Sequence, residues 1–156
     1  MANTDIRPAN GLLGFPLSGG NRHFVLRYTL NLASNPLAQN EILYFADIPA
    51  GLEIKKIVPR VLTAEGAVAT FDVGDYTNAA PPVAIDADGY VDGVDGNAVA
   101  WAPDEVTISG EGVASPAYGV NGKLYTAAAV LGLTTPTAAG MDAAVIQLDV
   151  EVVRHD

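Results

Sequence analysis

The sequence predicts an all-β fold, an antiparallel β-sandwich of which the jelly roll is one common form, preceded by an extended N-terminal arm. Apolar and polar residues alternate with the period of a strand through most of the chain, and no stretch of about ten residues or more carries a helical period. Turn signals rich in glycine and proline separate seven or eight such segments. A chain of 156 residues can bury one core without disulfides or a structural metal.

The alternation is clearest in the first and last expected strands. In residues 23–31 the side chains on the expected core face are Phe24, Leu26, Tyr28 and Leu30. In the last strand the expected core residues are Ile146, Leu148, Val150 and Val152. The other segments expected to be strands are 41–46, 52–63, 67–73, 105–109 and 123–131. Pro59 cannot donate a hydrogen bond to a neighbouring strand, so we expect the strand 52–63 to lie at a sheet edge or to be bulged there.

The first 21 residues differ from the rest and are predicted to form an arm, with the sandwich domain over residues 22–156. They contain two prolines and four glycines without alternation, a composition that gives them no core of their own. Four large apolar side chains in this segment favour an arm that contacts a neighbouring molecule, and a frayed terminus is the alternative. These apolar residues are Leu12, Leu13, Phe15 and Leu17.

Charge is distributed unevenly along the chain. No lysine or arginine occurs between Arg60 and Lys123, and this interval holds ten of the 18 acidic residues, so it accounts for the whole net charge of −10. A chain this acidic should be repelled by a phosphate backbone, and we expect no binding to nucleic acid. This uneven distribution of charge either serves solubility alone or indicates a molecule with one acidic side and one less acidic side.

Several kinds of chemistry lack the residues they need. The chain has no cysteine, and its two histidines, His23 and His155, stand far apart in the sequence, so thiol catalysis, cysteine-type zinc sites and paired-histidine sites are not expected. No nucleophile elbow and no phosphate-binding glycine loop is present. We therefore predict no catalytic residues, no cofactor and no metal ligands. No secretory leader and no membrane-spanning segment is expected either.

The acidic stretch DADGYVDGVDGN, residues 86–97, invites comparison with a calcium loop. An EF-hand loop needs oxygen ligands at its first, third and fifth positions and glycine at the sixth. With Gly89 at the sixth position, Ala84 occupies the first, whereas starting from Asp86 puts Val91 where the glycine belongs. We therefore expect an exposed acidic turn without a tight metal, and weak calcium binding by an irregular loop stays open as the alternative.

Residues 41–75, EILYFADIPAGLEIKKIVPRVLTAEGAVATFDVGD, combine features in a characteristic order. A short strand leads through a proline-glycine turn at 48–51 into a long strand, then through Glu65 and Gly66 into a strand ending in Val-Gly-Asp at 73–75. An aspartate-glycine stretch and an alternating final strand follow. From about residue 22 onward the chain resembles small virion proteins of tailed bacteriophages that decorate or cement the capsid.

That resemblance implies a jelly-roll-like sandwich without an active site, acting on the outer surface of the capsid. The implied partners are the major capsid protein and further copies of the chain, as a homotrimer. The expected capsid-docking residues are Arg7, Leu12, Leu13, Phe15, Leu17, Arg22 and Arg27. The main alternative is a carbohydrate-binding sandwich of a head-fibre, tail or surface receptor-binding protein, and a small hydrolase is a third possibility.

Overall fold

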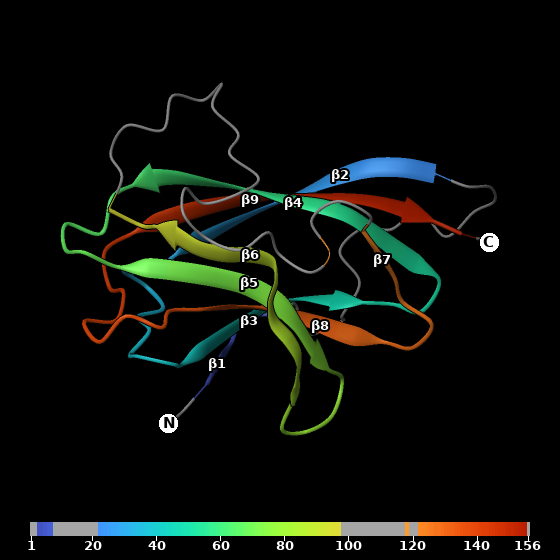
Figure 1. Ribbon diagram of the computed structural model, residues 1–156, viewed down its shortest axis with the longest axis horizontal. Helices are drawn as coiled ribbons and strands as arrows, with labels where there is room; N and C mark the ends of the chain where they lie inside the picture. Colours follow the sequence, from blue (N-terminus) through green and yellow to red (C-terminus); the bar gives the residue numbers. More distant parts are fainter. Residues whose placement is uncertain (1–2, 8–21, 98–117, 119–121, 156) are drawn as a thin grey trace.

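The computed structural model describes residues 3–7, 22–97, 118 and 122–155, and these residues form two β-sheets packed face to face (Figure 1). No helix occurs among the described residues, so the predicted all-β sandwich is confirmed. The strands are β1 (Thr4–Asp5), β2 (Arg22–Asn31), β3 (Ile42–Ile48), β4 (Leu52–Thr63), β5 (Thr70–Thr77), β6 (Ala84–Asp95), β7 (Lys123–Leu124), β8 (Ala129–Thr134) and β9 (Val145–Arg154).

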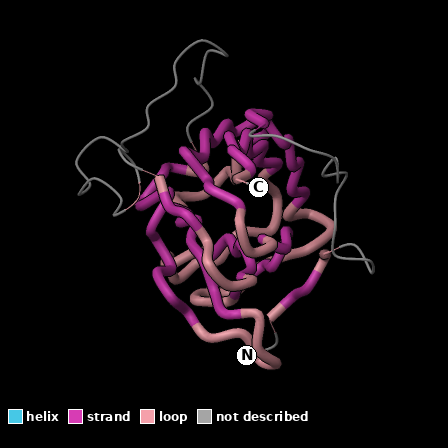
Figure 2. The backbone as a smooth tube through the Cα atoms, turned by 90° about the vertical axis from the view of Figure 1, so that its right-hand side faces the viewer, coloured by secondary structure: helices cyan, strands magenta, loops and turns pink. Residues whose placement is uncertain are grey.

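The strand order is that of a jelly roll. One sheet has the order β2-β9-β4-β7, and the other has the order β1-β3-β8-β5-β6. The antiparallel pairs β2 with β9, β3 with β8, β4 with β7 and β5 with β6 are nested, as in one long hairpin rolled up on itself. Figure 2 looks along the long axis of this roll, with the strands surrounding a common interior. Among the strands of the described residues, β1 alone lies outside the nesting, and it pairs in parallel with β3.

The core lies between the two sheets. β9 runs between β2 and β4, and its inward side chains are at most 1% exposed, as the alternation predicted. Burying a side chain of this kind stabilises the fold by about 1.5 to 3 kcal/mol. The inward residues of β9 are Ile146, Leu148, Val150 and Val152, and the facing sheet contributes Phe71, Val73, Leu131 and Leu133 among others.

Pro59 lies on a strand that is only partly covered. β4 pairs with β9 along its length, whereas on its other side β7 pairs only with Glu53 and Ile54. Within the described residues, β4 therefore has a single neighbour at Pro59, where no second ladder needs a donor. This agrees, as far as the described residues extend, with the first of the two predicted positions, an edge or a bulge.

The prediction of an exposed turn at residues 86–97 is wrong for most of that stretch. The structure continues β6 to Asp95, with Tyr90, Val91 and Val94 buried in the core. The pairing with β5 jumps from Asp75 opposite Asp86 to Val73 opposite Val91, so β6 carries three extra residues in a large bulge. The bulge interrupts the alternation of apolar and polar residues that marks a regular strand. The sequence therefore resembles an aspartate-glycine turn, although its apolar side chains point into the core.

Two other expected segments differ from the structure. The segment 123–131 was predicted as one strand, but it divides into β7 in one sheet and the start of β8 in the other. The first part of the predicted arm belongs to the sandwich, because β1 joins the edge of the five-stranded sheet beside β3. The predicted strand 105–109 and arm residues 8–21 lie outside the described residues.

Candidate functional site

The outer face of the four-stranded sheet carries rows of ion pairs that cross from strand to strand. In the first row Asp149 of β9 accepts from Arg27 of β2 at 2.7 and 3.0 Å. The same carboxylate lies 3.5 Å from Arg60 of β4. The hydrogen bond from Arg27 holds the pKa of Asp149 below its ordinary value, against the opposite effect of burial.

Further ion pairs on the same sheet repeat this arrangement. Glu151 of β9 lies 2.8 Å from His23 and 3.1 Å from Lys56. The hydrogen bond from Lys56 is the main cause that lowers the pKa of Glu151. Glu53 of β4 pairs with Lys55 and, at 2.7 Å, with His155. Exposed pairs of this kind contribute little stability each, so their main effect is to fix the side chains and to neutralise the acids of this face.

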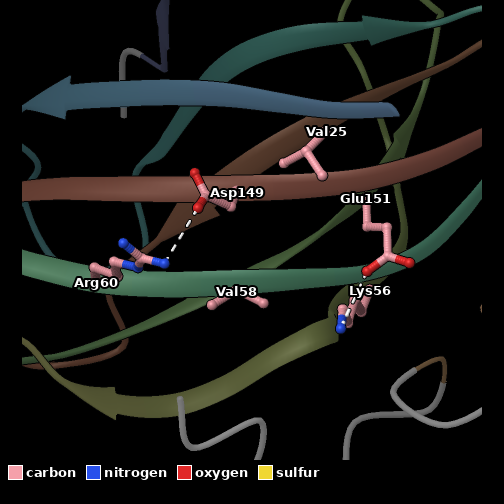
Figure 3. A pocket seen from close by; sticks show the side chains of 6 residues that line it. All are labelled: Val25, Lys56, Val58, Arg60, Asp149 and Glu151. Carbon is pink, nitrogen blue, oxygen red and sulfur yellow. Dashed lines mark ion pairs between the residues drawn. The ribbon is translucent and has the colours of Figure 1, made fainter. Parts of the chain in front are cut away.

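A shallow hollow of about 300 Å³ lies on this face. Figure 3 shows its lining, with two valines among charged side chains that form ion pairs with one another. The lining residues are Val25, Lys56, Val58, Arg60, Asp149 and Glu151. Val25 is 55% exposed, and the buried Nε of Arg60 has no hydrogen-bond partner among the described residues. Apolar patches ringed by paired charges suit contact with another macromolecule better than catalysis.

The five-stranded sheet differs, because Asp72 on β5 and Asp88 and Asp92 on β6 lie close together and form no ion pair within the described residues. Burial raises the pKa of Asp72 to about 6, and the charges of Asp92 and Asp88 add to the effect. Asp72 still accepts the backbone N–H of Gly93 at 2.7 Å. Burial is also the first cause that raises the pKa of Asp92. The two sheets thus carry different charge, in line with a two-sided molecule.

Replacing Asp72 with asparagine is expected to stabilise the fold at neutral pH by about 1 to 2 kcal/mol, a range kept low because solvent partly screens the site. Asparagine keeps an acceptor for Gly93 and removes a charge repelled by Asp88 and Asp92. Since the folded-state pKa of Asp72 lies above the ordinary value of 3.8, the wild type gains this stability only as pH falls from about 6 toward 3.8. Urea unfolding of the wild type and of Asp72→Asn at neutral pH and near pH 5 measures the difference between their free energies of unfolding, which should be smaller near pH 5.

The matched control is Asp88→Asn, because Asp88 is exposed and belongs to the same acidic group. It should stabilise the protein less at neutral pH than the change at Asp72. A variant Asp72→Asn that is less stable than the wild type at neutral pH would show that the Gly93 hydrogen bond needs the charged carboxylate and outweighs the repulsion.

Three of the predicted docking residues lie in the described part of the chain, and they are placed on both sheets. Arg7 follows β1 at the edge of the five-stranded sheet, where it binds Asp5 at 2.5 Å and Asp47 at 2.7 Å. Arg27 lies on the outer face of the other sheet, and Arg22 begins β2. The remaining predicted docking residues, Leu12, Leu13, Phe15 and Leu17, lie outside the described residues. The ion-pair rows and the hollow were not predicted, because they depend on the register of three strands distant in sequence.

The described part of the chain contains no group of three or more histidine, cysteine, aspartate or glutamate side chains able to hold a metal ion. It also contains no helix long and apolar enough to cross a bilayer.

Comparison with known proteins yields a match in structure rather than in sequence. No family model matches the chain, and no curated protein matches its sequence. Among solved structures, a chain of the "Capsid of Ralstonia phage GP4" superposes with a TM-score of 0.57 at 17% sequence identity. The likeness establishes the fold. It extends over 98% of this chain and 99% of the other, so the two chains share one architecture over nearly their whole lengths.

Proposed function

We propose that this protein is a structural component of a tailed-phage virion that decorates the outside of the capsid and stabilises it without catalysis. The observation that carries the proposal is the fold shared, over 98% of this chain, with a chain of a phage capsid structure. The order of turns and strands in residues 41–75 supports it independently. A protein that binds only the assembled shell stabilises that shell by mass action, because its contacts must break before the shell opens.

The outer face of the four-stranded sheet is the docking side in this proposal. Its ion pairs neutralise its acids, whereas the acidic group of β5 and β6 is best kept in water, where salt screens the repulsion. Arg7, bound to Asp47, would fix the point where the arm leaves the sandwich, and the apolar arm residues would bind a neighbouring subunit.

Replacing the four apolar arm residues with serine tests the arm directly. Because the substituted residues all follow β1, the variant should keep the unfolding temperature of the wild type, yet bind shells at least about tenfold more weakly. Binding is measured by co-sedimentation with shells of the phage that encodes the protein, stripped of the chain itself. The substitutions are Leu12→Ser, Leu13→Ser, Phe15→Ser and Leu17→Ser.

The control changes two exposed apolar residues away from the arm, Val83→Ser and Ile85→Ser, which are 61% and 50% exposed. This variant should bind shells like the wild type. Equal binding by the arm variant would refute the role of the arm. A truncation of residues 2–20 is less suitable, because it also removes β1 from its sheet.

The homotrimer is part of the same proposal, because three copies around one axis multiply a small contact area. Light scattering in solution and electron microscopy of decorated shells measure the copy number per site. A protein that is monomeric in both settings would exclude the trimer.

Retention on immobilised glycans, or an unfolding temperature raised by calcium, would instead favour the carbohydrate-binding alternative.

A further inference from the structure

Asp75, the last residue of the Val-Gly-Asp motif, is a carboxylate enclosed between the two sheets. It lies on β5 of the five-stranded sheet and is 0% exposed. Its Oδ2 is 2.5 Å from the Nζ of Lys123, which comes from β7 of the opposite sheet. Its Oδ1 is buried and has no hydrogen-bond partner among the described residues. A buried carboxylate with one oxygen unsatisfied and a single amine against the other is an uncommon arrangement for a purely structural ion pair.

Tyrosine side chains surround this pair. The hydroxyl of Tyr125 donates to Oδ2 of Asp75 at 2.8 Å and lies 2.8 Å from the hydroxyl of Tyr90. Lys123 Nζ donates to the hydroxyl of Tyr118 at 2.8 Å and lies 4.3 Å from the centre of its ring. The side chain of Lys123 keeps 22% of its surface exposed, so a small molecule such as water can leave the site.

We propose that Lys123 and Asp75 are joined by an isopeptide bond, a covalent amide between Nζ of the lysine and Cγ of the aspartate. The amine is already in contact with the carboxyl group, which is held on the buried side of β5. Holding two reacting groups in this way raises their effective concentration by many orders of magnitude. The proposal does not depend on the function proposed above.

The reaction is a condensation that needs no other reactant. Burial lowers the pKa of Lys123, but hydrogen bonds to Asp75 and Tyr118 outweigh this effect and raise it, so the resting lysine is an ammonium group. Transfer of one proton along the Nζ to Oδ2 hydrogen bond gives a neutral amine and a carboxylic acid. The nitrogen lone pair then attacks Cγ, and the C–N bond forms. Nζ loses a second proton to the departing hydroxyl, the C–O bond breaks, and one water molecule leaves.

Two neighbouring groups lie close to the reacting carboxyl group. Tyr125 donates to Oδ2, the oxygen that takes the proton from Nζ and departs as water, and so holds the departing group in place. Asp86 stands opposite Asp75 in the ladder between β5 and β6. Burial raises the pKa of Asp86, and the charges of Asp88 and Asp75 raise it further, so this second carboxyl takes up a proton more readily than an ordinary aspartate.

The bond would benefit the fold at a weak point. β7 has only two residues, and its ladder to β4 consists of two residue pairs. A covalent link across the sandwich would fasten β7 to the opposite sheet and join residues 48 positions apart in the chain. Such a link restricts the unfolded chain, and it replaces two buried charges with a neutral amide.

Intact mass spectrometry of the full-length protein, purified in its folded state and then denatured, tests the proposal. The expected result is a mass lower than that of the sequence by one water molecule. Trypsin gives a second reading, because no lysine or arginine lies between Arg60 and Lys123. An acylated Lys123 resists cleavage, so the digest should contain one internally linked peptide from 61 to 154 in place of separate peptides 61–123 and 124–154.

The control is Lys123→Arg, which keeps a cation beside Asp75 but cannot form the amide. It should show the full sequence mass and normal tryptic cleavage at position 123. Dehydration of an aspartate-glycine pair, such as Asp88-Gly89, also removes one water, but it would persist in this variant and leave Lys123 open to trypsin. A wild-type protein with the full sequence mass and complete cleavage after Lys123 overturns the proposal, whatever role the protein has in the virion.

Discussion

Replacing Gly74 with alanine is expected to destabilise the protein by about 4 kcal/mol or more, enough to unfold a domain of ordinary stability. A Cβ atom at this position would lie 2.5 Å from the carbonyl oxygen of Ala87 and closer still to that of Asp86. These obstructing atoms are backbone atoms of the β6 bulge, so no side-chain rotation can relieve the clash. The bulge would have to move away from β5, and Tyr90 would be drawn from the core with it.

Thermal or urea unfolding of the variant, compared with Gly66→Ala, measures this effect. Gly66 has a φ of +84°, but a Cβ atom there would meet nothing within 4 Å. Its replacement should therefore cost only the strain of a left-handed backbone, about 1 to 2 kcal/mol. If the two variants unfold at similar denaturant concentrations, the prediction is wrong, and β6 can move away from the added Cβ atom at little cost in stability.

Local patterns were sufficient to predict the strands that alternate regularly. β4 begins and ends at the predicted residues, because a proline-glycine turn precedes it and polar residues follow it. The inward residues of β9 were likewise visible in the sequence, since a strand buried on one face repeats every second residue. These patterns predict the strands themselves but not which strands pair, so the nested pairing of the jelly roll becomes visible only in the structure.

Features produced by contacts between distant residues were not predictable in this way. The bulge of β6 hides its apolar residues among aspartate-glycine pairs, and nothing local shows that Gly74 leaves space for it. The contact between Asp75 and Lys123 joins two sheets, and neither residue stands in a recognisable motif for such a pair. The two arginine partners of Asp149 come from two other strands, so the sequence around Asp149 does not show them.

The final prediction concerns Glu65, in the turn between β4 and β5. Its carboxylate is 9% exposed and accepts the backbone N–H groups of three consecutive residues, those of Asp142 and Ala144 at 2.8 Å and that of Ala143 at 3.1 Å. These residues lead into β9, so one side chain fixes the entry of the central strand. Burial opposes ionisation, but the hydrogen bonds outweigh it and lower the pKa of Glu65.

Replacing Glu65 with alanine is therefore expected to cost about 3 kcal/mol, because it leaves these three N–H groups, one of them on a fully buried residue, without their acceptor. Glu65→Gln keeps one acceptor oxygen but loses the charge, and should cost about half as much. Since the folded-state pKa lies below the ordinary value of 4.5, the contribution of Glu65 is complete above that pH and is lost as pH falls through the lowered pKa. In urea unfolding at neutral pH, the wild type should be the most stable, Glu65→Gln intermediate and Glu65→Ala the least stable. The difference in unfolding free energy between the wild type and Glu65→Ala should become smaller in acid. A gap that is small at neutral pH, or that widens in acid, would show that another group holds the entry to β9.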